Sequence, residues 1–307
     1  MAPLVSVAVV VKDRRERMLR CLDALLAQTH PDYEVLVIDN GSLDGTAEAC
    51  AERGRGSDTP VRVEVIDGTI GRLRNAAAQL AEGELIAFTD SDCMPTPGWL
   101  EAAARAFDDE RVGVVTGMTL PEQPPPYERW AVSQEVTEQT WRFEACNVFF
   151  RREPLLSAGG FAELNWGEDT TAGWAMLRAG WQARFVPEAL VLHDITYPGR
   201  AWYIRRASQY GEAAAVFKRF PEARHRILWG RYFLRKRDAA YVLALLGAAL
   251  TGRTRAAWLM TLPYLYMGVP HRLQLNAAHD FAEGLALDSS ILAGAIRSSI
   301  RWRTLVL

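Results

Sequence analysis

Short runs of apolar, β-branched residues alternate with amphipathic helical segments through the first third of the chain. Val5–Val11 is continuously apolar, which is typical of a strand buried on both faces. The sequence then predicts a helix at 15–28, a strand at 34–38, a helix from 44, a strand at 61–66, a helix at 71–81 and a strand from 84. Strands that alternate with helices at this spacing predict βαβ units and a mostly parallel α/β sheet.

The fourth expected strand ends in two carboxylates, Asp90 and Asp92, separated by one residue. Ligands of open parallel sheets bind outside the carboxyl ends of the strands, so these acids should face a ligand. On an extended segment both side chains point to the same side, where they repel each other unless a cation lies between them. A divalent metal that carries substrate phosphates suits such a pair. The alternative is an ordinary strand-to-turn junction, because Asp and Ser are common turn residues.

The second expected strand also ends in an acid, Asp39, which is followed by Asn40. The carboxyl ends of parallel strands meet at one edge of the sheet, so both acidic loops should border the same crevice. A single loop of this kind is usually a turn or a helix cap. Two of them at one edge favour a binding site.

Together these segments resemble the family-two glycosyltransferases with the GT-A fold. The resemblance runs from residue 4 to about residue 195, about two thirds of the chain, and rests on the order and spacing of its pieces. Those pieces lie at residues 5–7, 27–29, 37–46, 71–77, 81–92, 97–100, 145–147, 151–153, 159–161, 167–169, 179–181, 187–189 and 193. The resemblance implies an α/β, Rossmann-like, mostly parallel sheet flanked by helices. We expect the GT-A domain at 1–222 and a basic and apolar helical extension, outside the resemblance, at 223–307.

The resemblance also implies a donor site for a nucleotide-diphospho-sugar, with UDP or dTDP favoured. Asp39 and Asn40 would lie beside a pyrimidine, where an Asn amide can both donate and accept hydrogen bonds. Arg74 would lie near the ribose or the phosphates, although a position on a surface helix is the alternative for it. Val9 and Val11 would border the donor on the first strand.

One departure from the family pattern follows the first strand. Relatives commonly have Pro-Thr-Tyr-Asn where this chain has Val10-Val11-Lys12-Asp13. The usual aromatic contact to the base is therefore in doubt, whereas the fold is not, because Val continues a strand better than Pro does.

For the metal, the resemblance implies Mn²⁺ or Mg²⁺ with three ligands. Asp92 would be the main ligand, Asp90 would contact ribose or metal, and His193 would be the third ligand. A neutral imidazole binds Mn²⁺ better than Mg²⁺. A structural histidine is the alternative for His193.

Transfer of a sugar to a hydroxyl with inversion needs a carboxylate that takes the acceptor's proton. By motif position that base is Asp169, and Glu168 would orient it or bind the acceptor. The alternative is that two acids at a helix start complement the macrodipole, and both can be true at once. Trp166, which could stack on a sugar or belong to the core, and Asn147 are further candidates on the acceptor side.

The C-terminal third differs from the rest in charge. Residues 1–199 have 18 Lys and Arg against 31 Asp and Glu, a balance of −13, whereas residues 200–307 have 17 against 6, a balance of +11. Lys218–Arg237 contains eight basic residues and one acid, and two uncharged runs follow, Ala239–Leu250 and Ala256–Pro270. An expected helix, Tyr203–Arg219, precedes them.

Each uncharged run is shorter than the roughly 20 residues that a membrane-spanning helix needs. Basic and aromatic residues before an apolar hairpin suit peripheral attachment to an anionic inner-membrane surface. The alternative is a buried hairpin that packs on the catalytic domain or on a second subunit. Nucleic-acid binding is disfavoured, because an apolar hairpin has no role in it.

Four widely spaced cysteines without a zinc spacing predict reduced thiols, and no signal peptide is expected, which favours a cytoplasmic protein on the inner face of the membrane. The expected activity is inverting, metal-dependent transfer of a hexosyl or deoxyhexosyl group to a glycan or lipid-linked acceptor. A catalytically silent nucleotide-sugar-binding or scaffold protein is the alternative. A nucleotidyltransferase is less favoured, because no Gly-rich phosphate loop lies near the first strand.

Overall fold

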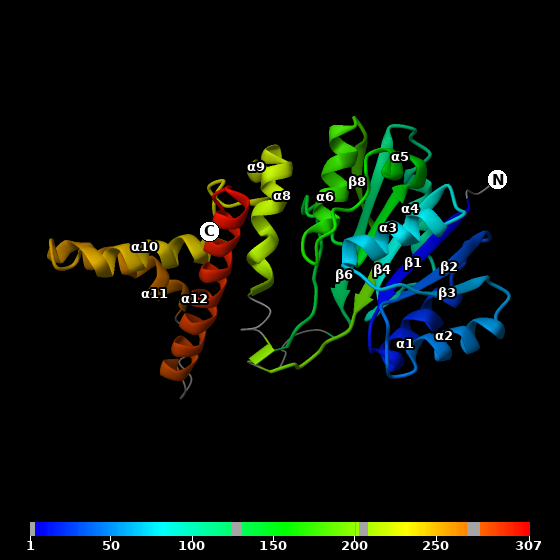
Figure 1. The fold of residues 1–307 in the computed structure, drawn as a ribbon, viewed down its shortest axis with the longest axis horizontal. Helices are drawn as coiled ribbons and strands as arrows, with labels where there is room; N and C mark the ends of the chain where they lie inside the picture. Colours follow the sequence, from blue (N-terminus) through cyan, green and yellow to red (C-terminus); the bar gives the residue numbers. More distant parts are fainter. Residues whose placement is uncertain (1–3, 124–130, 200, 203–207, 269–276) are drawn as a thin grey trace. The chain divides into compact units, whose positions relative to one another are not determined.

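The computed structural model describes residues 4–123, 131–199, 201–202, 208–268 and 277–307 of the 307-residue chain (Figure 1). The chain forms two compact units, Met1–Tyr197 and Pro198–Leu307. The sequence predicted a boundary after residue 222. In the structure, residues 198–222 group with the C-terminal helices instead. Residues 203–207 of the expected helix Tyr203–Arg219, and residues 269–270 of the second uncharged run, lie outside the described residues.

The first unit contains an eight-stranded sheet in the order β3-β2-β1-β4-β7-β6-β8-β5. The β1–β2, β1–β4, β2–β3 and β6–β8 pairs are parallel, whereas the β4–β7, β6–β7 and β5–β8 pairs are antiparallel. The strands are β1 (Val5–Val11), β2 (Tyr33–Asp39), β3 (Val61–Val65), β4 (Leu85–Asp90), β5 (Cys93–Pro95), β6 (Val112–Pro121), β7 (Asn147–Arg151) and β8 (Gln182–His193). The predicted α/β sheet is confirmed.

Helices cover both faces of this sheet, because alternate side chains of a strand point to opposite sides (Figure 1). Helices α1 (Arg15–Leu26), α2 (Thr46–Arg55) and α4 (Trp99–Ala106) contribute to one hydrophobic core, which also contains Val5, Val7, Val9 and Val11 of β1. Helices α3 (Ile70–Leu80), α5 (Arg152–Ser157) and α6 (Glu168–Arg178) contact one another, and α3 contacts β1 and β2.

The strand register brings the acidic residues together at one edge of the sheet. Val11 at the end of β1 lies opposite Asp39 of β2, and Val10 lies opposite Asp90 of β4. The two acids therefore flank the carboxyl end of β1, as the alternating pattern predicts.

The loop before α6 is held against α3 by close backbone contacts. Gly159 and Gly160 end α5 with φ of 93° and 62°, so both need the left-handed conformation. The Asn75 amide donates to the Phe161 carbonyl and accepts from its N–H, each at 2.8 Å. A Cβ at Gly71 would lie 1.8 Å from the Ala162 carbonyl oxygen, so only glycine permits this approach. These contacts fix the start of α6 beside α3.

Strand β7 begins at Asn147, directly after a turn. Residues 144–146 form a turn in which the Asn147 N–H donates to the Glu144 carbonyl at 3.1 Å. This turn presents the Ala145 N–H to the Asp169 carboxylate.

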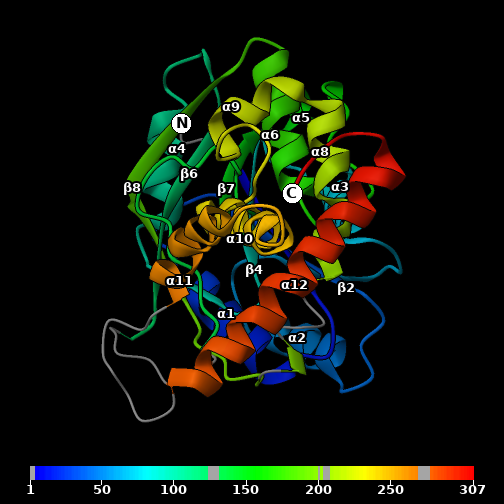
Figure 2. The same cartoon turned by 90° about the vertical axis from the view of Figure 1, so that its left-hand side faces the viewer.

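The regular elements of the second unit, among its described residues, are helices. Asp288 of α12 lies at its centre, where it pairs with Arg235 at 3.1 Å and Arg237 at 2.7 Å and accepts from the Tyr264 hydroxyl at 2.8 Å. Figure 2 views α10 nearly end-on, with α11 beside it and α12 crossing. The elements are η1 (Ser208–Glu212), α8 (Ala213–Arg219), η2 (Pro221–Ala223), α9 (Arg224–Ile227), α10 (Lys236–Leu250), η3 (Arg255–Thr261), α11 (Leu262–Gly268) and α12 (Ala277–Trp302).

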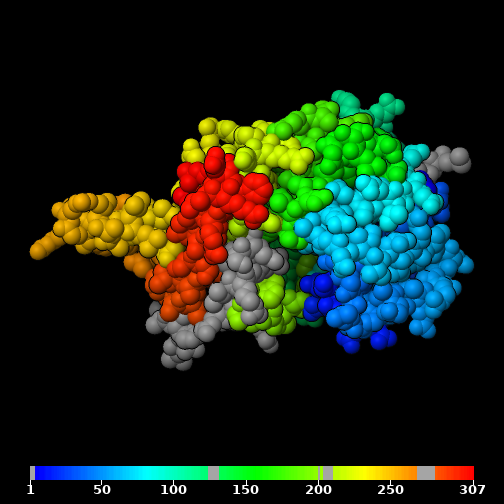
Figure 3. Space-filling model, in the orientation of Figure 1, coloured from blue at the N-terminus to red at the C-terminus, as the bar shows by residue number. Residues whose placement is uncertain are grey.

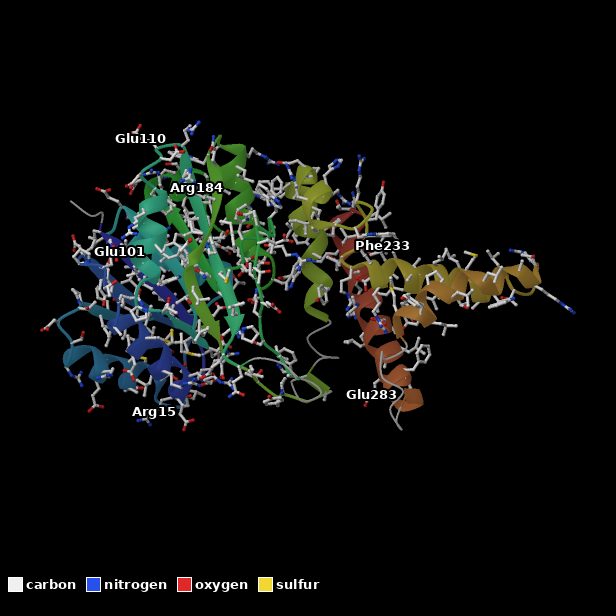
Figure 4. The ribbon with its side chains drawn as sticks, turned by 180° about the vertical axis from the view of Figure 1, so that it is seen from behind. Arg15, Glu101, Glu110, Arg184, Phe233 and Glu283 are labelled. Carbon is white, nitrogen blue, oxygen red and sulfur yellow. The ribbon has the colours of Figure 1, made fainter. Side chains whose placement is uncertain are left out.

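The segment from α10 to α11, called the hairpin below, exposes much of its apolar surface. Its outer part stands clear of α12 in Figure 3, and its side chains are mostly carbon in Figure 4. The large exposed side chains are Leu243, Leu245, Leu246, Trp258, Leu259, Leu262, Leu265, Tyr266 and Met267. None of the helices in the described parts of the chain has both the length and the hydropathy needed to cross a membrane.

Candidate active site

The candidate metal ligands Asp92 and His193 lie side by side. Cys93 of β5 pairs with His193 of β8, which brings the turn after β4 against the end of β8. The His193 Nε2 lies 3.7 Å from Asp92 Oδ1, and both residues are buried. The His193 Nδ1 lies 2.8 Å from the Asp194 carbonyl oxygen, so a proton on Nδ1 leaves the Nε2 lone pair facing Asp92.

This pair fits a divalent cation. Metal bonds to carboxylate oxygen and imidazole nitrogen are about 2.0–2.2 Å long, so one ion can contact both atoms across 3.7 Å. The Cys93 Sγ lies within 4.8 Å of both ligand atoms. Burial raises the pKa of the Cys93 thiol well above its usual range. The four cysteines are all free, as expected.

Arg14, to which the sequence reasoning gave no role, also contacts Asp92. Its Nη1 donates to Asp92 Oδ2 at 2.6 Å. Nearby, Asp194 pairs with Arg17 at 2.9 Å and donates its N–H to the Asp92 carbonyl at 2.8 Å. No periodicity or motif signals the Arg14 contact, because it joins positions 14 and 92 through tertiary structure alone.

Arg74 links the two acidic pairs of the site. This residue of α3 is buried, which contradicts the alternative of a surface helix. Its Nη1 donates to Glu168, and its Nη2 donates to Asp90 Oδ1 at 3.2 Å. Burial alone would lower the pKa of the guanidinium, but the two carboxylates raise it, so Arg74 stays charged. A buried cation between two acids fixes their relative positions.

Asp169, the candidate base, lies in the first turn of α6. Its Oδ1 accepts from the Thr170 N–H at 2.6 Å and its Oδ2 from the Ala145 N–H at 3.2 Å. Burial and the adjacent Glu168 carboxylate raise the pKa of Asp169 well above that of an ordinary aspartic acid. A raised pKa is the property of a carboxylate that accepts a proton near neutral pH.

Asp39 has an unsatisfied oxygen in the interior. Its Oδ1 accepts from the Ser42 N–H at 2.6 Å, whereas its buried Oδ2 has no hydrogen-bond partner among the described residues. A buried acceptor without a partner is costly, and an N–H of a bound ligand would satisfy it. Asn40 instead bonds the Gly68 backbone at 3.2 and 3.4 Å and so holds the loop after β3 beside Asp39.

The remaining candidates differ in how well their positions suit a ligand. The side chains of Val9 and Val11 are buried in the hydrophobic core, which leaves only their backbone for contact with a donor. Asn147 is buried and its amide bonds the Trp99 indole and the carbonyls of Met118 and Ala189, each at 2.8 Å, which favours a structural role. Trp166 is half-buried in the loop before α6, two residues from Glu168.

Comparison with known sequences gives one family and several relatives. The model of glycosyl transferase family 2 matches residues 6–178. Glycosyltransferase AglE of Haloferax volcanii is 29% identical over 57% of this chain and 64% of its own length. The pre-mycofactocin glycosyltransferase of Mycobacterium tuberculosis is 27% identical over 71% of this chain and 48% of its own length. The chain thus spans about half to two thirds of these curated relatives.

Solved structures share the fold. The mannosyltransferase PcManGT from Pyrobaculum calidifontis, in complex with GDP-Man and Mn²⁺, has a TM-score of 0.68 at 21% identity, over 97% of this chain and 87% of that one. S. aureus TarS 1-349 in complex with UDP-GlcNAc has a TM-score of 0.53 at 16% identity, over 98% of this chain and 92% of that one. At these identities the likeness establishes a GT-A-type fold.

Proposed function

The chain belongs to glycosyl transferase family 2, and from that membership we propose that it is an inverting, divalent-metal-dependent glycosyltransferase. It would move a hexosyl or deoxyhexosyl group from a nucleotide diphosphate to a hydroxyl of a glycan or lipid-linked acceptor. The observation that carries this proposal is the position of Arg74 between Asp90 and Glu168. Through Arg74, the end of β4 and the start of α6 belong to one site.

In this proposal Asp92 and His193 hold Mn²⁺ or Mg²⁺, and Asp90 contacts the ribose or the metal. When bound, the ion neutralises charge that develops on the diphosphate leaving group. Asp169 takes the proton of the acceptor hydroxyl as that oxygen attacks C1 and the bond to the diphosphate breaks. A single displacement of this kind inverts the configuration at C1. Glu168, held by Arg74, orients the base or the acceptor, and Trp166 is the proposed platform for an acceptor sugar.

The donor base is proposed to bind at Asp39. A pyrimidine imide carries one N–H, which the unpaired Asp39 Oδ2 could accept. UDP or dTDP is therefore the favoured carrier. PcManGT is in complex with GDP-Man and TarS with UDP-GlcNAc, so GDP-sugars should be tested beside UDP- and dTDP-sugars.

The acceptor side is proposed to lie at an anionic membrane surface on its cytoplasmic face. The hairpin presents exposed Leu246 and Trp258 together with exposed Arg253 and Arg255 at the turn between α10 and η3. Apolar and aromatic side chains next to cations suit the boundary between lipid headgroups and acyl chains. This arrangement favours peripheral attachment, which would bring the active site to lipid-linked acceptors.

A panel of UDP-, dTDP- and GDP-sugars, each with Mn²⁺ or Mg²⁺, tests the proposal. The expected result is that one donor raises the melting temperature in the presence of metal and is then hydrolysed or transferred. A donor that stabilises the protein but is neither hydrolysed nor transferred to any likely acceptor would favour the alternative, a catalytically silent nucleotide-sugar-binding or scaffold protein. The presence of both Glu168 and Asp169 counts against that alternative.

A further inference from the structure

Arg14 is the cation nearest to the proposed metal ligand Asp92. It is the N-cap residue of α1, three residues after the end of β1, and makes no side-chain cap bond there. Its backbone is anchored at both ends, because its N–H donates to Thr46 Oγ1 at 3.3 Å and its carbonyl accepts from the Met18 N–H at 2.9 Å. Only the side chain is free to change position.

That side chain neutralises the carboxylate that would hold the metal. Arg14 Nη1 contacts Asp92 Oδ2 at 2.6 Å, while the other oxygen, Oδ1, faces His193. An arginine keeps its charge at any pH at which a protein is folded. Its guanidinium and a divalent ion therefore compete for the charge of Asp92. The Arg14 side chain is 43% exposed and makes this contact through one nitrogen, so it can move aside.

The other arginines on this face of α1 have acids of their own. Arg17 pairs with Asp194 at 2.9 Å, and Arg20 pairs with Glu122 at 2.6 Å. These pairs hold Arg17 and Arg20 away from Asp92. Among the ion pairs of the described residues, Arg14 is the arginine that contacts Asp92.

We propose that Arg14 is a resident counter-ion of Asp92 that a divalent metal displaces, and that the displaced guanidinium then binds the donor's diphosphate. The inference rests on the proposed metal site at Asp92. Binding of the displaced guanidinium to the diphosphate follows from two facts. The anchored backbone keeps the side chain at the carboxyl edge of the sheet, and the geometry of a guanidinium matches that of a phosphate. Metal alone should then bind weakly, and metal with a nucleoside diphosphate should bind tightly.

The first test measures binding of Mn²⁺ alone, followed by the electron paramagnetic resonance signal of free Mn²⁺. Arg14→Gln should bind Mn²⁺ about fivefold more tightly than wild type, as expected when a half-exposed ion pair no longer competes. Arg14→Lys, which keeps the charge, should stay close to wild type. Arg15→Gln is the matched control, because it removes the same charge one residue away from an exposed side chain (Figure 4).

The second test measures binding of UDP and GDP at saturating Mn²⁺ by isothermal titration. For whichever nucleotide wild type binds, Arg14→Gln should bind about tenfold more weakly, the loss expected for a charge-assisted contact to phosphate. Mn²⁺ affinity of Arg14→Gln equal to or below that of wild type would overturn the proposal, and unchanged nucleotide affinity would overturn its second half. Absence of Mn²⁺ binding by wild type would instead overturn the metal site itself.

Discussion

His193 presents its Nε2 3.7 Å from Oδ1 of Asp92, although the two residues come from opposite halves of the first unit. The antiparallel pairing of β5 with β8 creates this neighbourhood, with Cys93 directly opposite His193. A carboxylate and an imidazole at this separation can share one cation, and the strand pairing holds both ligands on rigid elements.

The first prediction concerns Asp169 as the acceptor base. Asp169→Asn should lower kcat about 10²- to 10⁴-fold, the usual contribution of a positioned general base, with donor affinity little changed. Glu163→Gln is the control, since Glu163 is an exposed acid in the loop before the same helix. Steady-state kinetics with saturating donor measures the effect, and a kcat of Asp169→Asn within a few-fold of wild type would rule out this role.

The pH dependence of the activity is a second test of Asp169 as the base. A base must be deprotonated, so activity rises with pH through its pKa, and the raised pKa of Asp169 moves that rise above the value of about 4 of an ordinary aspartic acid. Burial and Glu168 raise this pKa while Arg74 lowers it. Glu168→Gln should therefore shift the acidic limb of kcat/KM to lower pH. An acidic limb that stays in place would show that another group limits activity.

Asp39→Ala should weaken donor binding through loss of the base contact. KM for the donor should rise about 10- to 100-fold while kcat changes little, because the lost contact exists in both ground and transition states. Asp58→Ala, at an exposed acid after α2, is the control. Equal donor KM for wild type and Asp39→Ala would mean that the unpaired Asp39 Oδ2 does not face the base.

Arg74→Gln should destabilise the protein, because it leaves Glu168 and Asp90 without their buried cation. The expected loss is about 3–5 kcal/mol in the free energy of unfolding, seen as a melting temperature lower by roughly 10 °C. Arg72→Gln, on the exposed side of the same helix, should change little. Adding Glu168→Gln to Arg74→Gln should restore part of the stability, and a strictly additive double variant would argue against coupling.

The exposed hairpin should bind vesicles that contain phosphatidylglycerol in preference to pure phosphatidylcholine. Replacing Arg253 and Arg255 with Glu should weaken that binding at least roughly thirtyfold, at about 1 kcal/mol per basic residue. The double variant Leu246→Ser, Trp258→Ser should weaken binding both to vesicles with phosphatidylglycerol and to vesicles of pure phosphatidylcholine. Leu43→Ser, at an exposed apolar residue of the first unit, is the control. Co-sedimentation measures the binding. Dimers that dissociate in the hairpin variants, without vesicle binding, would assign the surface to a second copy of the chain.

Local patterns predicted the elements because each is decided by short-range periodicity. Val5–Val11 forms β1 with the expected bounds, and the acids after β2 and β4 lie at one edge because parallel strands share their direction. Side-chain partners depend on tertiary packing and could not be predicted in this way. Asn147 was a site candidate, yet its amide is used by Trp99 and two backbone carbonyls.

Tertiary packing also decides two further features that the sequence did not predict, the Arg14–Asp92 contact and the boundary between the two units. Arg14 has no sequence signal that distinguishes it from Arg15, and only the fold brings it to Asp92. The stretch 198–222 groups with the second unit, because its helix α8 packs on α12, with the Ala214 N–H donating to Ser298 Oγ at 3.0 Å. Contacts between residues 78 and 84 positions apart leave no periodic trace in the sequence of either segment.

The most direct test of the central claim is metal-dependent sugar transfer by wild type and Asp92→Asn. With the donor selected from the nucleotide-sugar panel, EDTA should abolish wild-type turnover and Mn²⁺ should restore it. Asp92→Asn should lower kcat/KM by about two to three orders of magnitude at any Mn²⁺ concentration, since metal stabilisation of the leaving group is worth several kcal/mol. Asp108→Asn, at an exposed acid after α4, should behave as wild type. Turnover that resists EDTA, or near-wild-type turnover by Asp92→Asn, would contradict the account.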